Sequence, residues 1–196
     1  MMYYIAKFLY WLAGWKLDNN MPKDIRKCVM IAAPHTSNWD LYYARLAFVL
    51  MNIPVRFTVK KEWLRFPFNL FMKPIGAIGI DRSPKTGSTE RKSMVEAMAD
   101  LFKDKDELVV LVTPEGTRSL ATKWKSGFYY VAVTAGVPIA LGFLDYEKKI
   151  AGVGKVVYPT GDYIKDMKEI MDFYKDIKGR YPEKFSVDLE VMGNEK

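Results

Sequence analysis

The stretch KCVMIAAPHTSNWDLYYARLAFVLMN (27–52) decides the fold class of this sequence. Residues 27–33 are apolar after Lys27 and contain no glycine or proline, which is the pattern of a buried strand. Ser37 to Asp40 has the S-x-x-D form of a helix start, with Ser37 as N-cap and Asp40 at position N3. The helix is expected to run to Asn52, because a proline follows two residues later. A buried strand joined to a helix by a short polar loop indicates an α/β fold.

The alternation of strands and helices continues along the rest of the chain. Further strands are expected at 55–60, 75–80, 107–113, 137–143, 151–158 and 184–191. Helices are expected at 1–15, 62–73, 88–103, 122–135 and 162–178, with a polar break at 17–24. This order predicts a largely parallel or mixed central sheet flanked by helices. With 196 residues the chain has room for one core, so we predict an N-terminal helical segment (1–17) and a single domain (22–196).

Charge and cysteine content limit the classes of function. The net charge is +7, from 30 Lys and Arg against 23 Asp and Glu, which favours anionic partners such as nucleic acid, lipid headgroups or an acidic carrier protein. The same charge also agrees with solubility alone. Cys28 is the only cysteine, so the chain forms no internal disulfide, which is compatible with a reducing compartment. One cysteine and one histidine also nearly exclude a zinc site of the usual kind.

The N-terminal stretch MMYYIAKFLYWLAGWKL (1–17) is rich in aromatic and aliphatic residues. Lys7 lies inside it and no small-residue cleavage pattern follows, so it does not resemble a signal peptide. A helix over 1–15 would be roughly 22 Å long, whereas the hydrocarbon core of a bilayer is about 30 Å thick. Tyrosine and tryptophan suit the membrane interface. We therefore expect a helix that lies in the interface; the alternative is a helix packed on the protein's own core or on a second copy.

His35 is the only histidine, and it lies between the predicted strand and the helix that contains Asp40. A carboxylate in the first turn of that helix can reach the imidazole, select its tautomer and stabilise the imidazolium. This spacing suggests that His35 is a general base supported by Asp40. The simpler interpretation is that Asp40 caps its helix and His35 is a polar loop residue.

Two arginines follow predicted strands. Arg118 belongs to TPEGTRS (113–119), directly after the strand with the strongest pattern, and Arg82 follows the strand at 75–80. A guanidinium binds phosphate oxygens through paired hydrogen bonds, so two arginines at strand ends of one sheet can converge on a phosphate. For each arginine taken alone, a surface salt bridge is the competing interpretation.

Four segments together resemble a known family. PHTSNWD (34–40) carries the H-x4-D pattern of the glycerolipid acyltransferases, the family of the 1-acylglycerol-3-phosphate acyltransferases. GAIGIDRS (76–83) is similar to their second block, PEGTRS (114–119) to their third and VPI (137–139) to their short fourth block. The blocks occur in the family order and cover about residues 31–139.

The resemblance implies transfer of a fatty acyl chain from acyl-CoA or acyl carrier protein to the hydroxyl of lysophosphatidate or a related lyso-lipid, in phospholipid biosynthesis. It implies no cofactor, no metal and no nucleic acid, and a peripheral or monotopic protein on the cytoplasmic side of the cell membrane. The catalytic residues it implies are His35 and Asp40. The substrate-binding residues expected at the strand ends are Lys60, Lys61, Arg82, Glu115, Gly116, Thr117 and Arg118.

Other functions fit less of the sequence. The chain contains no G-x-S-x-G run, so the usual nucleophile turn of a serine hydrolase is absent. A Cys28–His35 pair is formally conceivable, but Cys28 begins an apolar strand and is expected to pack in the core. A basic, non-enzymatic protein that binds membranes or nucleic acid explains the charge and the aromatic N-terminus, but not the order of the four segments. An acyltransferase that acts on a non-glycerolipid acceptor is the closer alternative.

Overall fold

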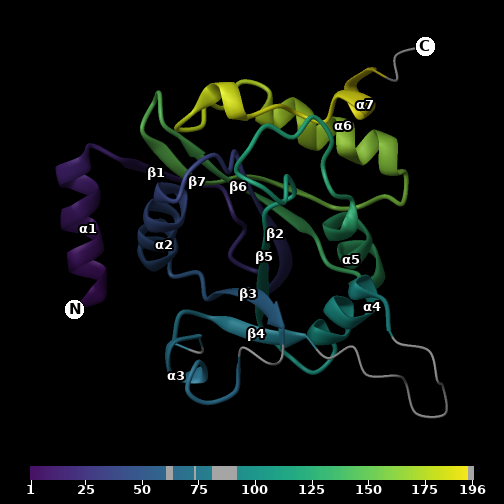
Figure 1. Cartoon of the computed structure of the whole chain (residues 1–196), viewed down its shortest axis with the longest axis horizontal. Coiled ribbons are helices and arrows are strands. Elements are labelled where there is room, and N and C mark those ends of the chain that lie inside the picture. Colours follow the sequence, from purple (N-terminus) through teal and green to yellow (C-terminus); the bar gives the residue numbers. More distant parts are fainter. Residues whose placement is uncertain (61–63, 73, 81–91, 194–196) are drawn as a thin grey trace.

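A seven-stranded sheet forms the centre of the molecule (Figure 1). The computed structural model describes residues 1–60, 64–72, 74–80 and 92–193. Its strands are β1 (Lys16–Asn19), β2 (Lys27–Ala33), β3 (Val55–Lys60), β4 (Ala77–Ile80), β5 (Leu108–Val112), β6 (Ile139–Asp145) and β7 (Ile150–Val157). Its helices are α1 (Met2–Ala13), α2 (Trp39–Met51), α3 (Asn69–Met72), α4 (Met94–Ala99), α5 (Gly127–Ala135), α6 (Tyr163–Tyr174) and α7 (Leu189–Gly193). Short 3₁₀ turns lie at Asp100–Phe102 and Pro182–Lys184. The predicted single α/β domain is confirmed.

The strand order is β1-β7-β6-β2-β5-β3-β4. The five strands from β6 to β4 are parallel to one another. β7 runs antiparallel to β6, because the four residues 146–149 form a turn that is too short for a crossover. The sheet is therefore mixed, and its parallel part contains every predicted catalytic and binding segment that the structure describes.

Successive side chains of β2 point to opposite faces of the sheet, as strand geometry requires. Val29 and Ile31 belong to the larger core, which is shared with α4, α5 and α6. Cys28 and Met30 pack on the other face, next to Phe48 of α2. Helices cover both faces of β2, so the continuous apolar run 27–33 correctly indicated a central strand.

α1 lies outside α2, at the edge of the molecule in Figure 1. Ala6 and Tyr10 are buried against α2, and the Tyr10 hydroxyl donates a hydrogen bond to the carbonyl of Tyr43 at 2.8 Å. Most of the other side chains of α1 are exposed, among them Phe8 and Trp11. The helix thus packs on the domain along one narrow stripe and presents an aromatic surface outward. No helix in the described residues is long and apolar enough to cross a membrane.

Strand β1 was not predicted, because residues 17–19, three of its four residues, fall in the predicted polar break at 17–24. All four residues are exposed, so no apolar alternation marks the strand. Its pairing depends on β7, where Gly152 has no side chain and lets the backbone at Asp18 approach. A sheet edge supplied by residues more than a hundred positions away is decided by tertiary structure, not by local pattern.

The strand predicted at 184–191 is wrong. Among the described residues, 185–188 belong to neither a helix nor a strand, and Leu189–Gly193 is helix α7. The Trp124 indole donates to the carbonyl of Ser186 at 3.0 Å. Ser186 is therefore bonded to a loop side chain instead of to a neighbouring strand. Asp188 accepts backbone N–H groups at the start of α7 and stabilises the helix instead.

Candidate active site

Three adjacent parallel strands end at the same edge of the sheet. β2 lies between β5 and β6, with Ile31 paired to Val112 and Ala33 paired to Phe143. The loops that follow these strands therefore meet at one place. The sheet thus brings together a histidine loop, a glutamate turn and the β6–β7 turn, although they are far apart in the sequence.

His35 and Asp40 face each other in the loop after β2 and the first turn of α2. His35 Nδ1 lies 3.3 Å from Asp40 Oδ2, and the His35 side chain is 26% exposed whereas that of Asp40 is 5% exposed. The N–H groups of Thr36 and Ser37 both donate to Asp40 Oδ2 at 2.8 Å. A carboxylate held in this way favours the tautomer with the proton on Nδ1 and leaves Nε2 as the nitrogen that can accept a proton.

The start of α2 differs from the expected capping pattern. The N-cap is Asn38 rather than Ser37, and α2 begins at Trp39. The Ser37 hydroxyl accepts the N–H of Trp39 at 3.2 Å, one residue earlier than a full capping box requires. The other half of the motif is present, because Asp40 accepts the Ser37 N–H. The same carboxylate thus closes the loop and faces the imidazole, so the capping and catalytic interpretations are compatible.

Glu115 reaches the histidine loop from the turn after β5. Its Oε2 accepts the backbone N–H of His35 at 2.8 Å, and its Oε1 is buried without a hydrogen-bond partner in the described part of the chain. Burial raises the pKa of Glu115 to about 7, and the hydrogen bond from His35 opposes this only in part. Glu115 therefore holds the backbone of the loop that carries His35.

The raised pKa of Glu115 predicts a pH effect on stability. The pKa of this carboxyl is 4.5 in the unfolded chain and about 7 in the folded protein. Its contribution to the free energy of unfolding is therefore complete below pH 4.5 and is lost as the pH rises through 7. We expect the free energy of unfolding of the wild type to fall, relative to Glu115→Gln, by on the order of 1–3 kcal/mol across this window. Urea unfolding of both proteins at the two ends of the window measures it. The exposed Glu147→Gln is the control, and a pH-independent difference between wild type and Glu115→Gln would contradict the prediction.

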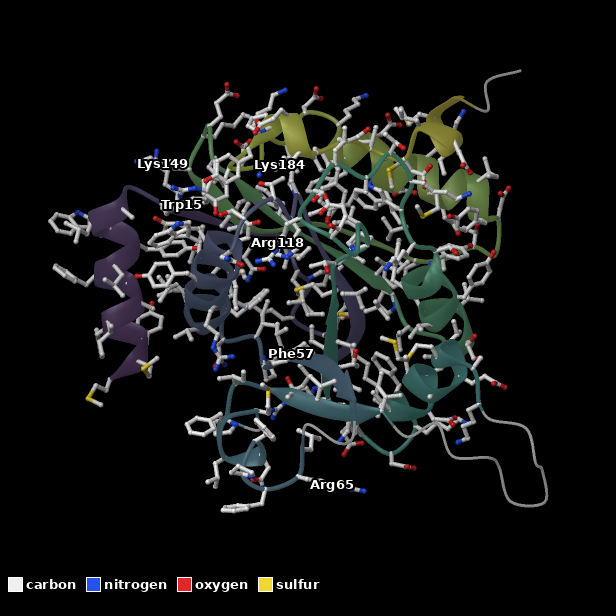
Figure 2. The ribbon with its side chains drawn as sticks, in the orientation of Figure 1. Trp15, Phe57, Arg65, Arg118, Lys149 and Lys184 are labelled. Atoms are coloured by element: carbon white, nitrogen blue, oxygen red, sulfur yellow. The ribbon has the colours of Figure 1, made fainter. Side chains whose placement is uncertain are left out.

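Residues 116–119 of the PEGTRS turn are exposed, whereas Pro114 is buried like Glu115. Gly116 has φ +66°, and a Cβ there would collide with the side chain of Lys125, which lies over the turn. The Lys125 N–H donates to the carbonyl of Pro114 at 2.9 Å, which closes the loop. Thr117 Oγ1 accepts the N–H of Ser119, and Arg118 is exposed, below Lys184 in Figure 2. Lys125 was not predicted, because it lies in a segment that reads as helix.

The remaining predicted cations can be placed only in part. Lys60 ends β3, which is parallel to β5, so its backbone lies at the same edge of the sheet as the other loops. Ile80 pairs with Lys60 at the end of β4. Lys61 and Arg82, both predicted to bind substrate, lie outside the described residues.

The loop after α6 is a further part of the site that the sequence did not indicate. Gly179 packs closely against Pro34 and Thr36, and the Tyr181 N–H donates to Thr36 Oγ1 at 3.2 Å. Arg180 is exposed and lies 5.4 Å from the ring centroid of Trp39, a cation–π distance. The loop thus places the Arg180 cation next to Trp39, which precedes Asp40 in the sequence. No motif marks it, because the contact joins segments that are distant in the sequence.

Two other chemistries find no support in the geometry. Cys28 is fully buried near the opposite end of β2, and burial raises the pKa of its thiol to about 12. His35 lies beyond the other end of the strand, and the part of β2 from Cys28 to Ala33 alone spans about 16 Å, so the two cannot form a catalytic pair. Within the described ranges, no group of three or more His, Cys, Asp or Glu side chains is arranged to hold a metal ion.

A histidine oriented by a buried carboxylate at the carboxyl edge of a parallel sheet is an arrangement suited to general base catalysis. The model of the family described as "Acyltransferase" matches residues 16–140, more than half of the chain. The protein therefore belongs to this acyltransferase family, the glycerolipid acyltransferases that the four segments resemble, and is an enzyme that transfers acyl groups. A comparison with curated proteins gave no match.

Proposed function

We propose that the protein transfers a fatty acyl chain from a thioester donor to the hydroxyl of a phosphate-bearing lyso-lipid, as in phospholipid biosynthesis. One observation carries the proposal: Asp40 occupies the Nδ1 side of His35, so that Nε2 is the nitrogen directed away from the carboxylate. Such an imidazole removes a proton from a hydroxyl without forming an acyl-enzyme.

The reaction then proceeds in two steps. Nε2 of His35 takes the proton of the acceptor hydroxyl as the oxygen attacks the thioester carbonyl. The tetrahedral intermediate expels the thiolate, which receives the proton held by His35. Asp40 stabilises the imidazolium between these steps. The donor proposed is acyl-CoA or acyl carrier protein, both anionic, which suits a chain with net charge +7.

An acyl-transfer assay with purified protein tests the proposal. Acyl-CoA and acyl carrier protein are each combined with lysophosphatidate, glycerol 3-phosphate and a lyso-lipid that lacks a phosphate monoester, and released thiol and acylated product are measured. We expect turnover of lysophosphatidate and little with the last acceptor. Turnover of only the lyso-lipid that lacks a phosphate monoester would contradict the proposed acceptor class. Salt-sensitive vesicle binding with no turnover of any pair would favour the non-enzymatic alternative.

The phosphate of the acceptor is proposed to bind cations at the edge of the sheet. We expect Arg118→Ala to raise the KM for lysophosphatidate by about 10- to 100-fold, the size of one lost charge-assisted hydrogen bond, with little change in the KM for the donor. Lys123→Ala is a matched control, because it removes a cation from the same loop that is already paired with Glu190 at 2.7 Å. If Arg118→Ala raised only the KM for the donor, Arg118 would be assigned to donor binding instead.

We also propose that α1 lies at the water–lipid interface on the cytoplasmic side of the cell membrane, where a lipid acceptor is concentrated. Deleting residues 2–16 is a poor test, because Tyr10 and Trp15 are buried in the domain. Replacing exposed Phe8 and Trp11 together with serine leaves the buried stripe intact. Loss of these rings should reduce co-sedimentation with anionic vesicles, without changing the melting temperature or turnover of a short-chain, water-soluble acceptor.

The control for this experiment is the double variant Val133→Ser, Ile164→Ser. These two exposed apolar residues lie on α5 and α6, which cover the other face of the sheet. Its vesicle binding should equal that of the wild type. Equal losses in both double variants would mean that α1 is not the anchor.

A further inference from the structure

Tyr146 lies in the turn between β6 and β7, at the edge of the sheet where β2 ends. Its hydroxyl donates a hydrogen bond of 2.7 Å to Asp40 Oδ1. The other carboxylate oxygen, Oδ2, faces His35 Nδ1 and accepts the Thr36 and Ser37 N–H groups. The two oxygens therefore have separate partners, and within the described part of the chain Tyr146 is the side chain that donates to Oδ1.

The turn holds the Tyr146 backbone firmly in place. The Tyr146 N–H donates to the carbonyl of Lys178 at 2.8 Å, which ties the turn to the loop after α6. Buried Asp145 accepts the N–H groups of Glu147 and Lys148 at 3.1 and 3.0 Å. Such an Asx turn fixes the backbone on both sides of the tyrosine.

The Tyr146 ring belongs to an aromatic cluster that involves α1, α2 and the β6–β7 turn. Its centroid lies 5.0 Å from that of Trp15 in an edge-to-face arrangement, and 6.0 Å from that of Tyr43. Edge-to-face contacts restrict the ring and direct the hydroxyl along one line. The N-terminal segment therefore packs against the Tyr146 ring through Trp15.

The Tyr146 phenol stays protonated at physiological pH, so it can donate a hydrogen bond to the Asp40 carboxylate. Burial, then the hydrogen bond to Asp40, raises the pKa of Tyr146 far above its ordinary value. Arg180 opposes this shift in part, and Tyr43 adds to it. The ionisable groups around the His35–Asp40 pair, called the dyad below, come from α2, the turn after β5, the β6–β7 turn and the loop after α6.

We propose that Tyr146 is a positioning residue, whose hydroxyl holds the Asp40 carboxylate in the rotation that points Oδ2 at His35 Nδ1. Without this donor, Asp40 Oδ1 loses its hydrogen bond in a buried site, and rotation of the carboxylate toward other donors competes with its contact to His35. The imidazole then populates both neutral tautomers. The kinetic consequence rests on the proposed function, whereas the effect on the tautomer does not.

The test uses the fact that His35 is the only histidine in the chain. Nitrogen-15 NMR of the imidazole reports its neutral tautomer without overlap from another residue. We expect the full-length wild type to show the Nδ1–H tautomer, and Tyr146→Phe to show a mixture of both. The matched control is Tyr10→Phe, which removes another buried hydroxyl from the same cluster, one that bonds to the carbonyl of Tyr43. It should leave the tautomer unchanged.

The kinetic measurement separates positioning from folding. Tyr146→Phe should lower kcat by about 10- to 100-fold, the size expected for one hydrogen bond to a charged group, with both KM values nearly unchanged. Replacing Tyr146 with 4-aminophenylalanine restores a donor and should recover most of the rate and the tautomer. Replacing it with 4-methylphenylalanine restores the size alone and should recover neither.

Each outcome has a defined meaning. An unchanged tautomer in folded Tyr146→Phe or in the 4-methylphenylalanine variant would overturn the inference. Equal behaviour of the 4-amino and 4-methyl variants would do so as well, because it would assign Tyr146 a packing role. If wild-type protein transferred no acyl group, the proposed function would fail, while the tautomer measurement would still decide the role of Tyr146.

Discussion

Replacing His35 with alanine should lower kcat by about a hundred- to ten-thousand-fold, the range that a general base contributes. The chain contains no second histidine that could take over the proton. His35 is partly exposed, and its backbone N–H bonds to Glu115 whatever the side chain is. The fold should therefore survive the substitution. Thiol release at saturating donor and acceptor measures the effect.

Two results complete the test of His35. The melting temperature and circular dichroism of His35→Ala should match those of the wild type, which shows that the loss is chemical. Added imidazole should restore part of the rate if the alanine leaves room for it. A folded variant with near-normal turnover would exclude His35 as the base and, with it, the proposed mechanism.

Asp40→Asn is expected to have the second-largest effect. The asparagine carries no charge to stabilise the imidazolium, and its NH₂ group must face either the Tyr146 hydroxyl or the N–H groups of Thr36 and Ser37, all of which are donors. We expect kcat to fall by about a hundredfold or more. We also expect the free energy of unfolding to fall by about 1–3 kcal/mol, because a buried donor is left without an acceptor.

A matched control separates the two effects. Asp166 is also a buried carboxylate that accepts a tyrosine hydroxyl, from Tyr129 at 2.8 Å, and it accepts the N–H and hydroxyl of Thr160. It lies at the start of α6, away from the dyad. Asp166→Asn should lose comparable stability and keep its kcat. If both variants lost kcat equally, destabilisation would explain the result and the catalytic role of Asp40 would be unsupported.

The packing of Trp15 links the N-terminal segment to the residues around His35 and Asp40. Trp15 stacks on Tyr43 with centroids 4.6 Å apart and contacts Tyr146 edge-on. The two interpretations of the segment, membrane contact and core packing, therefore concern different faces of one helix. The buried face carries Ala6 and Tyr10, and the exposed face is the part on which the membrane proposal rests.

The sequence by itself determined the parts of this protein that depend on local pattern. The apolar run 27–33 and the run at 107–113 predicted the central strands β2 and β5, because burial on both faces requires continuous apolar residues. The loop between β2 and α2 held the only histidine within reach of Asp40, since a strand followed directly by a helix brings positions 35 and 40 together. The order of the four segments indicated the acyltransferase family.

Only the tertiary structure decided what comes from distant residues. The polar strand β1, the helix α7 in place of a strand, and the contacts of Glu115 and Tyr146 with the dyad all depend on partners far away in the chain. Tyr146 has no motif, and its position follows from the register of β6 against β2. The physical reason is that a hydrogen bond depends on distance in space, whereas a sequence pattern records only distance along the chain.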